Sequence, residues 1–318
     1  MCCCSGRCAR GQFLNMASPP TVPGYAARLS AYPNKGACGL AERFDSQRTL
    51  TRKLDTLASL VRAANGKVVI LTGAGISTSA GIPDFRGPNG VWTIEERVRK
   101  QKKIEVAKKR TARSTSPPPP AKRVRKTPAK AVAAAASSFA SASPTVTHRA
   151  IAALVASRLV DFVVTQNVDA LHQRTTLPRD KLAVLHGSLF EERCSQCGAI
   201  AIVKDEIATI SFKPTGRSCA VCGGAMHDTL LDWEDALPEA EFTEAEARCD
   251  DAALVIVLGS SLRIEPAGSL PARAAGGAGG EGQYVIVNLQ TTPKVSLFFI
   301  FAHDCILVYY NSLIIKGL

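Results

Sequence analysis

The sequence lacks a secretory signal peptide, because no charged segment followed by an apolar run opens it. Its eleven cysteines are therefore not expected to form the disulfide framework of a small secreted domain, for which 318 residues are also too many. Position 2 holds Cys instead of the Gly that N-myristoylation requires, so acylation of the cysteine-rich "MCCCSGRC" is only an alternative. We interpret residues 1–23 as a disordered leader, or as an upstream extension with the working start at Met16.

Large apolar side chains are almost absent between residues 98 and 144, which are basic at first and then rich in Pro, Ala and Ser. Such a composition cannot offset the entropy of ordering and predicts a disordered insertion. Residues 97–130 hold 14 Lys and Arg against the single acid Glu105, whereas the whole chain has a net charge of +12. The basic clusters at 108–110 and 122–126 indicate contact with nucleic acid or an import receptor, or else only a solvated loop.

Residues 295–318 lack any amphipathic period and are almost wholly apolar. The segment is long enough to cross a membrane, but His303, Asp304 and Asn311 interrupt its middle, where polar groups are costly. We therefore do not expect a membrane anchor. The tail is interpreted as a core element or as a segment foreign to the native protein.

The ordered parts alternate between strand and helix patterns. Helices are predicted in "SQRTLTRKLDTLASLVRA", "THRAIAALVAS" and "EAEFTEAEARCDDA", and apolar strands in "KVVILTG", "LVDFVVTQN", "KLAVLHG", "ALVIVLGSSL" and "YVIVNLQ". This order predicts an α/β fold with an open, parallel, Rossmann-like sheet whose ligand crevice lies beyond the carboxyl ends of the strands. The predicted sheet domain comprises residues 24–97, 145–193 and 229–294.

Two cysteine pairs lie between the last two parts of this domain. Cys194 and Cys197 are followed after 21 residues by Cys219 and Cys222, and each pair has two residues between its members. Two such turns supply four thiolates for a tetrahedral zinc ion with no ligand position left open, so a structural zinc is predicted in a module of residues 194–228. A redox pair or two chance pairs are the alternatives.

Polar residues follow the predicted strands. The loop after the first strand contains Gly73, Ala74, Gly75 and Thr78, but the third glycine of a dinucleotide fingerprint is missing, so a tight structural turn is an alternative. Amides, hydroxyls and one imidazole end the other strands, a set suited to riboses and carboxamides. Without an acidic pair or a Ser-His-Asp arrangement, His186 is the best general base.

These residues resemble a known family. "GAGIST", "AGIPDFRGPNGVW", "TQNVDALH", "LHG", the two cysteine pairs, "LGSSL" and "IVNLQ" occur in the order seen in sirtuins. "RDKLAVLHG" and "DTLLDWEDALP" are most similar to the nuclear, chromatin-associated sirtuin six type. The resemblance covers about residues 24–293 without the insertion. It implies removal of acyl groups from protein lysine with NAD as a consumed substrate, yielding nicotinamide and O-acyl-ADP-ribose.

The resemblance also implies roles for individual residues. His186 would be the catalytic base, with Asn167 and Gln166 at the ribose beside nicotinamide and Asp169 in its carboxamide pocket. Trp92 and Trp233 would form walls of the acyl-lysine tunnel, or else are only core aromatic residues. The implied diphosphate contacts are Gly73, Ala74, Gly75 and Thr78; the mobile cofactor loop contains Asp84, Phe85 and Arg86; the adenosine half would be lined by Gly259, Ser261, Asn288 and Gln290.

The predicted partners are acyl-lysine proteins, with histones as candidates, and the predicted location is the nucleus. A mono-ADP-ribosyltransferase using the same cleft is one alternative. A non-catalytic, zinc-containing chromatin-binding module is another, because the tail from about Val295 replaces the segment that would close the adenine site.

Overall fold

The computed structural model describes residues 25–26, 28–32, 34–113, 139–276, 282–294 and 299–300. The predicted leader, the cluster at 122–126 and most of the apolar tail lie outside these residues.

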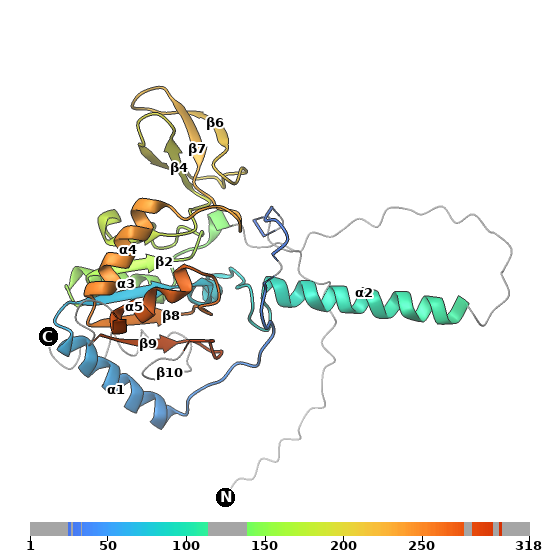
Figure 1. Ribbon diagram of the computed structural model, residues 1–318, viewed down its shortest axis with the longest axis horizontal. Helices are drawn as coiled ribbons and strands as arrows, with labels where there is room; N and C mark the ends of the chain where they lie inside the picture. The colour runs from blue at the N-terminus through green and yellow to red at the C-terminus, as the bar shows by residue number, and fades with distance from the viewer. Residues whose placement is uncertain are drawn as a thin grey trace, which may run out of the picture.

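A six-stranded parallel sheet forms the centre of the molecule (Figure 1). The predicted apolar strands all lie in it, and the prediction of an α/β fold with an open Rossmann-like sheet is confirmed. Its strands, in spatial order, are β10 (Phe299–Ile300), β9 (Gln283–Val287), β8 (Leu254–Leu258), β1 (Val68–Thr72), β2 (Phe162–Thr165) and β3 (Leu182–Val184).

The strand order reverses between β1 and β8. From β1 the chain builds outward through β2 and β3, and then returns to the other side of β1 for β8 and β9. Thr72 pairs with Thr165 of β2 and with Leu258 of β8, so these three strands end at the same level. In an open parallel sheet, the connections diverge at such a switch point and leave a crevice beyond the carboxyl ends of the strands.

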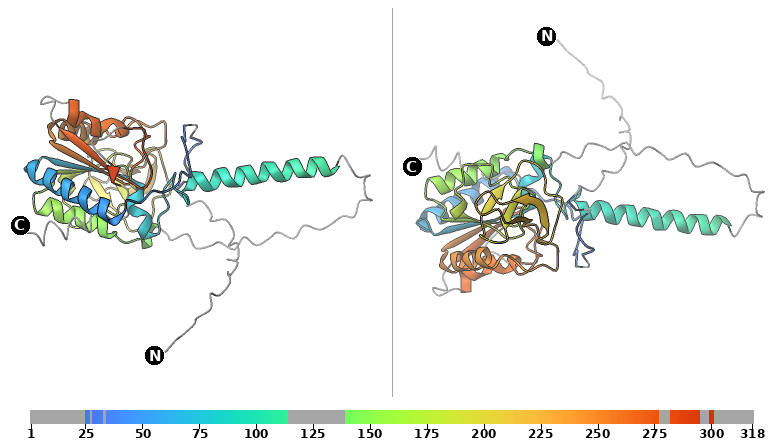
Figure 2. Two further views of the ribbon diagram at one scale, coloured as in Figure 1. Left: turned by 90° about the horizontal axis from the view of Figure 1, so that it is seen from below. Right: turned by 90° about the horizontal axis from the view of Figure 1, so that it is seen from above.

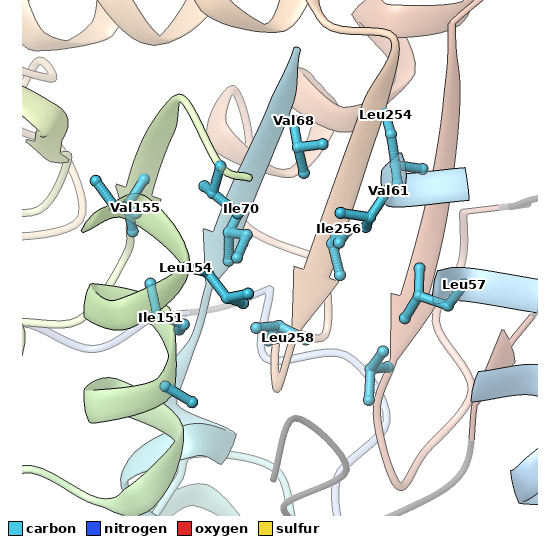
Figure 3. Packing of buried hydrophobic residues seen from close by; sticks show 14 of the residues in the cluster. Leu57, Val61, Val68, Ile70, Ile151, Leu154, Val155, Leu254, Ile256 and Leu258 are labelled. Atoms are coloured by element: carbon cyan, nitrogen blue, oxygen red, sulfur yellow. The ribbon is translucent and has the colours of Figure 1, made fainter. Parts of the chain in front are cut away.

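Helices cover both faces of the sheet. Val68 and Ile70 pack against α1 (Gln47–Ala63) and α3 (Val146–Ala156), as Figure 3 shows. Val69 and Leu71, which point the other way, pack against α4 (Glu239–Asp251) and α5 (Leu270–Gly276). Because successive side chains of a strand face opposite sides, an unbroken apolar run supplies both layers.

A second, smaller sheet stands beside the first (Figure 1). It is antiparallel, and its buried core among the described residues consists of only Cys194, Cys219 and Met226. Its strands, in spatial order, are β5 (Ile200–Ile202), β4 (Glu191–Cys194), β7 (Ala225–Asp228) and β6 (Pro214–Ser218). Four short 3-10 helices complete the described elements: η1 (Ala74–Ala80), η2 (Phe139–Ser141), η3 (Arg179–Lys181) and η4 (Ala267–Ser269).

The predicted disorder from residue 98 is wrong for the start of the insertion. Helix α2 (Val91–Arg113) continues to residue 113 and projects away from the sheets (Figures 1 and 2). The composition argument correctly excluded a packed core here, because all side chains from Arg99 to Ala107 are exposed. It overlooked that Lys, Arg, Gln and Ala have high intrinsic helix propensity and need no core.

The end of the predicted insertion is also ordered. Phe139 and Ala142 are buried beside Tyr25 and Leu171, although they were assigned to the disordered insertion. A single aromatic residue in an Ala- and Ser-rich stretch was the signal that ordered structure resumes before residue 145.

Part of the apolar tail belongs to the fold. Strand β10 pairs in parallel with β9, Ile300 is fully buried, and its carbonyl accepts a hydrogen bond from the Asn288 amide at 3.1 Å. At Ile300, the interpretation as a core element is confirmed. No helix in the described part of the chain is both long and apolar enough to span a membrane.

Candidate functional site

A cavity of about 560 Å³ lies at the switch point of the parallel sheet. The structure brings nearly all of the predicted cleft residues to its wall, although they come from five strand ends, the loop before α2, the first turn of α2 and the segment between β7 and α4. The predicted residues lining it are Gly73, Ala74, Gly75, Asp84, Phe85, Arg86, Trp92, Gln166, Asn167, Asp169, His186, Trp233, Gly259, Ser261, Asn288 and Gln290.

Thr78 is the exception. Its side chain is exposed, its hydroxyl donates to the Gly75 carbonyl at 3.0 Å, and it lies in an adjoining cavity of about 450 Å³. Asn288 and Gln290 line both cavities, so the two spaces meet beside the end of β9.

The glycines after β1 are required by the fold itself. A Cβ on Gly75 would lie 2.8 Å from the Cα of Gly259, and the Gly75 amide donates to the Gly259 carbonyl at 2.9 Å. Gly259 has a φ of +61°, a left-handed conformation that favours glycine. The glycines therefore let the loop pack directly against the end of β8 while it forms one wall of the cavity.

A buried hydrogen-bond network joins this loop to the end of β2. Asn167 donates through Nδ2 to the Gly73 carbonyl at 3.2 Å and to the Ser77 hydroxyl at 3.3 Å. The Ser77 hydroxyl donates to Asp169 at 2.7 Å, and the other carboxylate oxygen accepts from the Leu171 amide at 2.9 Å. Burial raises the pKa of Asp169. The network fixes both loops, and the contribution of Ser77 was missed from the sequence.

His186 is positioned as a base. Its Nδ1 lies 3.0 Å from the Gln166 carbonyl, which can only accept, so Nδ1 carries the proton and Nε2 is left as the proton acceptor. Burial lowers the pKa of His186 to about 4, so the imidazole is neutral at neutral pH. The Gln166 side chain accepts from the Ser260 hydroxyl at 2.6 Å, which ties the ends of β2 and β8 together.

Arg86 brings a buried cation to the cavity wall. Nε donates to the Lys35 carbonyl at 2.8 Å and Nη1 to the Ser261 hydroxyl at 3.1 Å, but Nη2 is buried without a partner among the described residues. Burial lowers the pKa of Arg86 to about 10, so it stays protonated at neutral pH. A buried donor without an acceptor is costly. It fits an anionic group such as the diphosphate of NAD.

Four aromatic rings gather at one end of the cavity. Trp92 lies 5.0 Å from Phe85 and 5.4 Å from Trp233 between ring centroids. Tyr32 stacks on Trp92 at 5.6 Å and lies 4.6 Å from Trp233. The two tryptophans were predicted as walls, but Tyr32 was missed, because only the folded chain brings its irregular segment to them.

The four predicted metal ligands come together in the small sheet. Their sulfur atoms all lie within 4.8 Å of one another, with Cys194 and Cys222 3.4 Å apart and Cys197 and Cys219 3.7 Å apart. A tetrahedral zinc ion with Zn–S bonds of about 2.3 Å requires sulfurs about 3.8 Å apart. The four thiols therefore fit a structural zinc ion, and the prediction of this site is confirmed.

Comparisons with known proteins agree with this geometry. The model of the Sir2 family matches residues 73–266. "NAD-dependent protein deacetylase SRT1" of Arabidopsis thaliana is 42% identical over 85% of this chain and 50% of that protein. "NAD-dependent protein deacetylase Sirt6" of Drosophila melanogaster is 38% identical over 84% of this chain and 76% of that protein. The chain spans about half the length of the plant relatives that it matches.

A solved structure gives the same result for the fold. "Sir2-p53 peptide-NAD+" matches with a TM-score of 0.55 and 27% identity, over 83% of this chain and 98% of that one. A second, a complex of Sir2 with an inhibitor, 2′-O-acetyl-ADP-ribose and a deacetylated p53 peptide, matches with a TM-score of 0.52 and 27% identity, over 83% of this chain and 99% of that one.

Proposed function

The chain belongs to the Sir2 family, and from this premise we propose that it is an NAD-dependent protein-lysine deacylase. It would transfer an acyl group from lysine to ADP-ribose and release nicotinamide. The observation that carries the proposal is the position of His186, a neutral imidazole in the cavity at the switch point, with Nδ1 held by the Gln166 carbonyl.

In this role, His186 is the general base. When bound, NAD supplies an electrophilic ribose carbon with nicotinamide as its leaving group. Nε2 of His186 accepts the proton of a ribose hydroxyl, and the hydrogen bond from Nδ1 to Gln166 keeps the ring in the tautomer that can do so. A pKa lowered to about 4 keeps this base unprotonated across the neutral range.

The other cavity residues bind and orient. Gln166 and Asn167 would hold the ribose beside nicotinamide, and Asp169 would shape the carboxamide pocket. Arg86, with its unpartnered Nη2, would meet the diphosphate, and Phe85 would shield the reacting carbon from water. We assign the remaining predicted contacts by position only: Gly73, Ala74, Gly75 and Thr78 at the diphosphate, Asp84 in the cofactor loop, and Gly259, Ser261, Asn288 and Gln290 at the adenosine half.

The aromatic end of the cavity would accept the acyl-lysine. Trp92, Trp233 and Phe85 present apolar faces within about one ring diameter of one another, which suits an aliphatic lysine stem and a neutral acyl group. We propose histones as substrates and the nucleus as the location. Support comes from the likeness to Drosophila "Sirt6" and human "sirtuin-7", the latter 34% identical over 79% of this chain, and from the basic residues 97–130.

One assay tests the activity. The purified chain is incubated with NAD and an acetyl-lysine peptide, and nicotinamide and O-acetyl-ADP-ribose are quantified. Formation of both in equal amounts is expected. Nicotinamide accompanied by ADP-ribose on protein would favour the mono-ADP-ribosyltransferase instead, and the absence of both products would refute an NAD-consuming enzyme.

A further inference from the structure

We infer that the distal part of helix α2 is a docking arm for the phosphate backbone of double-stranded DNA. We call residues 97–113, which form this part of the helix, the basic arm. The root of the helix is hydrogen-bonded into the loop that carries Asp84, Phe85 and Arg86, so DNA on the basic arm is coupled to the NAD cleft. This coupling rests on the proposed function, whereas the docking does not.

The basic arm is a charged rod in solvent. It contains nine Lys and Arg residues and one acid, Glu105, within one continuous helix. Figures 1 and 2 show that α2 leaves the body at its first turns and projects outward without packing on either sheet. The described side chains from Arg99 to Ala107 are all exposed.

Its cations differ from those of the body in their pairing. Arg248 and Arg273 of the sheet domain each contact two carboxylates. On the basic arm, Lys100 pairs with Glu96 at 2.7 Å. The other cations whose side chains the structure describes have no ion-pair partner among the described residues. These are Arg97, Arg99, Lys102 and Lys103.

The unpaired cations also repel one another. Arg99 and Lys103 are four residues apart and Arg99 and Lys102 three apart, so all three share one face of the helix. Like charges at this spacing destabilise a helix. A polyanion along this face removes the repulsion, and DNA releases counterions as it binds.

Double-stranded DNA fits the dimensions of the arm. Its 17 residues span about 25 Å at about 1.5 Å per residue, and DNA carries one charge per about 1.7 Å of axis. A helix about 10–12 Å across enters a major groove about 12 Å wide. The arm offers mostly Lys and Arg, which contact phosphates, so binding is expected to be independent of DNA sequence.

A membrane fits the arm less well. Val98 and Val106 share one face of the helix with Arg99, Lys102 and Lys103, whereas Ile104 lies on another. The arm therefore lacks the continuous apolar face that an interfacial helix needs.

The root of α2 is part of the cofactor loop. The Val91 amide donates to the Asp84 carbonyl at 2.8 Å and the Trp92 amide to the Phe85 carbonyl at 3.0 Å. Thr93, which is buried, donates through its hydroxyl to the Gly87 carbonyl at 2.8 Å. Because the helix begins within this hydrogen-bonded turn, a force or ordering applied along α2 reaches the loop directly.

The docking is tested with the full chain and a labelled random-sequence DNA duplex, by fluorescence anisotropy over a range of salt concentrations. The triple variant Arg99→Gln, Lys102→Gln and Lys103→Gln is expected to bind at least about tenfold more weakly, and the slope of log K against log salt should fall by about 2 to 3. The matched control is Arg48→Gln, Arg52→Gln and Arg62→Gln, which removes three exposed charges from α1. It should bind like wild type.

Three outcomes would overturn the docking: no binding by wild type, equal weakening in both triple variants, or equally tight and salt-dependent binding of polyglutamate or anionic vesicles. Circular dichroism of each variant checks that α2 is retained, so that loss of the helix is not mistaken for loss of contacts.

The coupling has its own readout, because the only two tryptophans of the chain, Trp92 and Trp233, lie together at the root of α2. With excitation at the red edge of indole absorption, where DNA is transparent, DNA is expected to change the tryptophan emission. By reciprocity, NAD should change the DNA affinity. If DNA binds while the emission and the NAD effect are both absent, the coupling is wrong. Neither measurement requires deacylation. Failure of the coupling and failure of the proposed deacylase function would therefore be recognised separately.

Discussion

The cleft and the zinc module hold their functional side chains by different means. The cleft lies at the edge of a sheet that is covered on both faces by apolar side chains from α1, α3, α4 and α5. The small sheet has three buried apolar residues, two of which are metal-ligand cysteines, and its strands β5 and β6 are largely exposed. A large core lets a protein bury polar groups at the edge of its sheet. A fold with a very small core needs a bound metal ion to stabilise it.

The two regions also differ in how their polar atoms are satisfied. In the cleft, Asn167, Ser77 and Asp169 are fixed by protein hydrogen bonds alone. In the small sheet, the amides of Gln196 and Val221 point at the sulfurs of Cys194 and Cys219, each at 3.4 Å. Amide donors directed at sulfur stabilise thiolates, so this geometry is complete only around a cation.

Removal of the metal should therefore affect the small sheet but not the parallel sheet. Cys197→Ser, or treatment with a chelator, should unfold the small sheet, because a structural zinc ion contributes about 10–16 kcal/mol in zinc-finger peptides. The parallel sheet should stay folded. Hydrogen exchange should rise in β4, β6 and β7 but not in β1 or β8, and metal analysis should show the loss of zinc.

Cys38→Ser is the matched control, since Cys38 is a cysteine outside the cluster. It should keep its zinc and its exchange pattern. Equal exchange in β1 and β7 after chelation would show that the two regions are one cooperative unit.

Replacement of the proposed base should act on the cleft alone. His186→Ala is expected to lower the deacylation rate by about 10²–10⁴-fold, the usual range for loss of a general base. The unfolding temperature and the zinc content should stay close to wild type. His227→Ala, in the small sheet, is the control and should keep its activity. Loss of zinc or of folding in His186→Ala would mean that His186 has a structural role.

Sequence reasoning located the parts of the site that follow local patterns. Gly73 and Gly259 come directly after an apolar strand, and Asn167 and His186 follow their strands by one intervening residue. Because parallel strands end at one edge, the cavity wall followed from strand order. The spacing of the four cysteines likewise predicted the metal site. In both cases, a short-range pattern is enough to predict the site, because the backbone geometry brings the residues together.

Long-range contacts were beyond such reasoning. Tyr32 contacts Trp233 across about two hundred residues of chain, and its irregular segment has no periodicity. Ile300 joins the sheet from an apolar tail whose hydrophobicity alone does not distinguish strand from helix. Helix α2 was missed for a different reason, since it forms from propensity and its hydrogen-bonded root without any core.

Two core substitutions, one in each sheet, compare the two regions through a smaller effect on stability. Leu71→Ala removes a fully buried side chain of β1 and should lower the free energy of unfolding of the parallel sheet by about 2–5 kcal/mol. Met226→Ala, also buried but in the small sheet, should leave that transition unchanged. Urea denaturation followed by tryptophan emission and by hydrogen exchange in each sheet measures both. A similar loss in the parallel sheet from both variants would contradict the separation.

The mildest effect is expected from acid. His148 and His172 are buried behind the cleft with ring centroids 4.6 Å apart. Burial, together with His172 and Arg149, lowers the pKa of His148 to about 2, and burial lowers that of His172 to about 3. Both pKa values lie below the ordinary 6.5, so the unfolded chain binds these protons first. Stability is then complete above about pH 6.5 and falls as the pH drops towards the folded values.

Each histidine should cost about 1.4 kcal/mol per pH unit below its unfolded pKa. Urea denaturation between about pH 5.5 and 4.5, where the unfolded histidines are protonated, should show this slope in the transition of the parallel sheet. The Thr72 hydroxyl lies 3.0 Å from Nε2 of His172. His172→Gln keeps a polar group beside this hydroxyl but cannot take up the proton. In this variant, the dependence of the free energy of unfolding on pH should be shallower by the contribution of one histidine. An unchanged slope would place the acid sensitivity elsewhere, and an equal loss in the small sheet would show that burial of imidazoles does not distinguish the two regions.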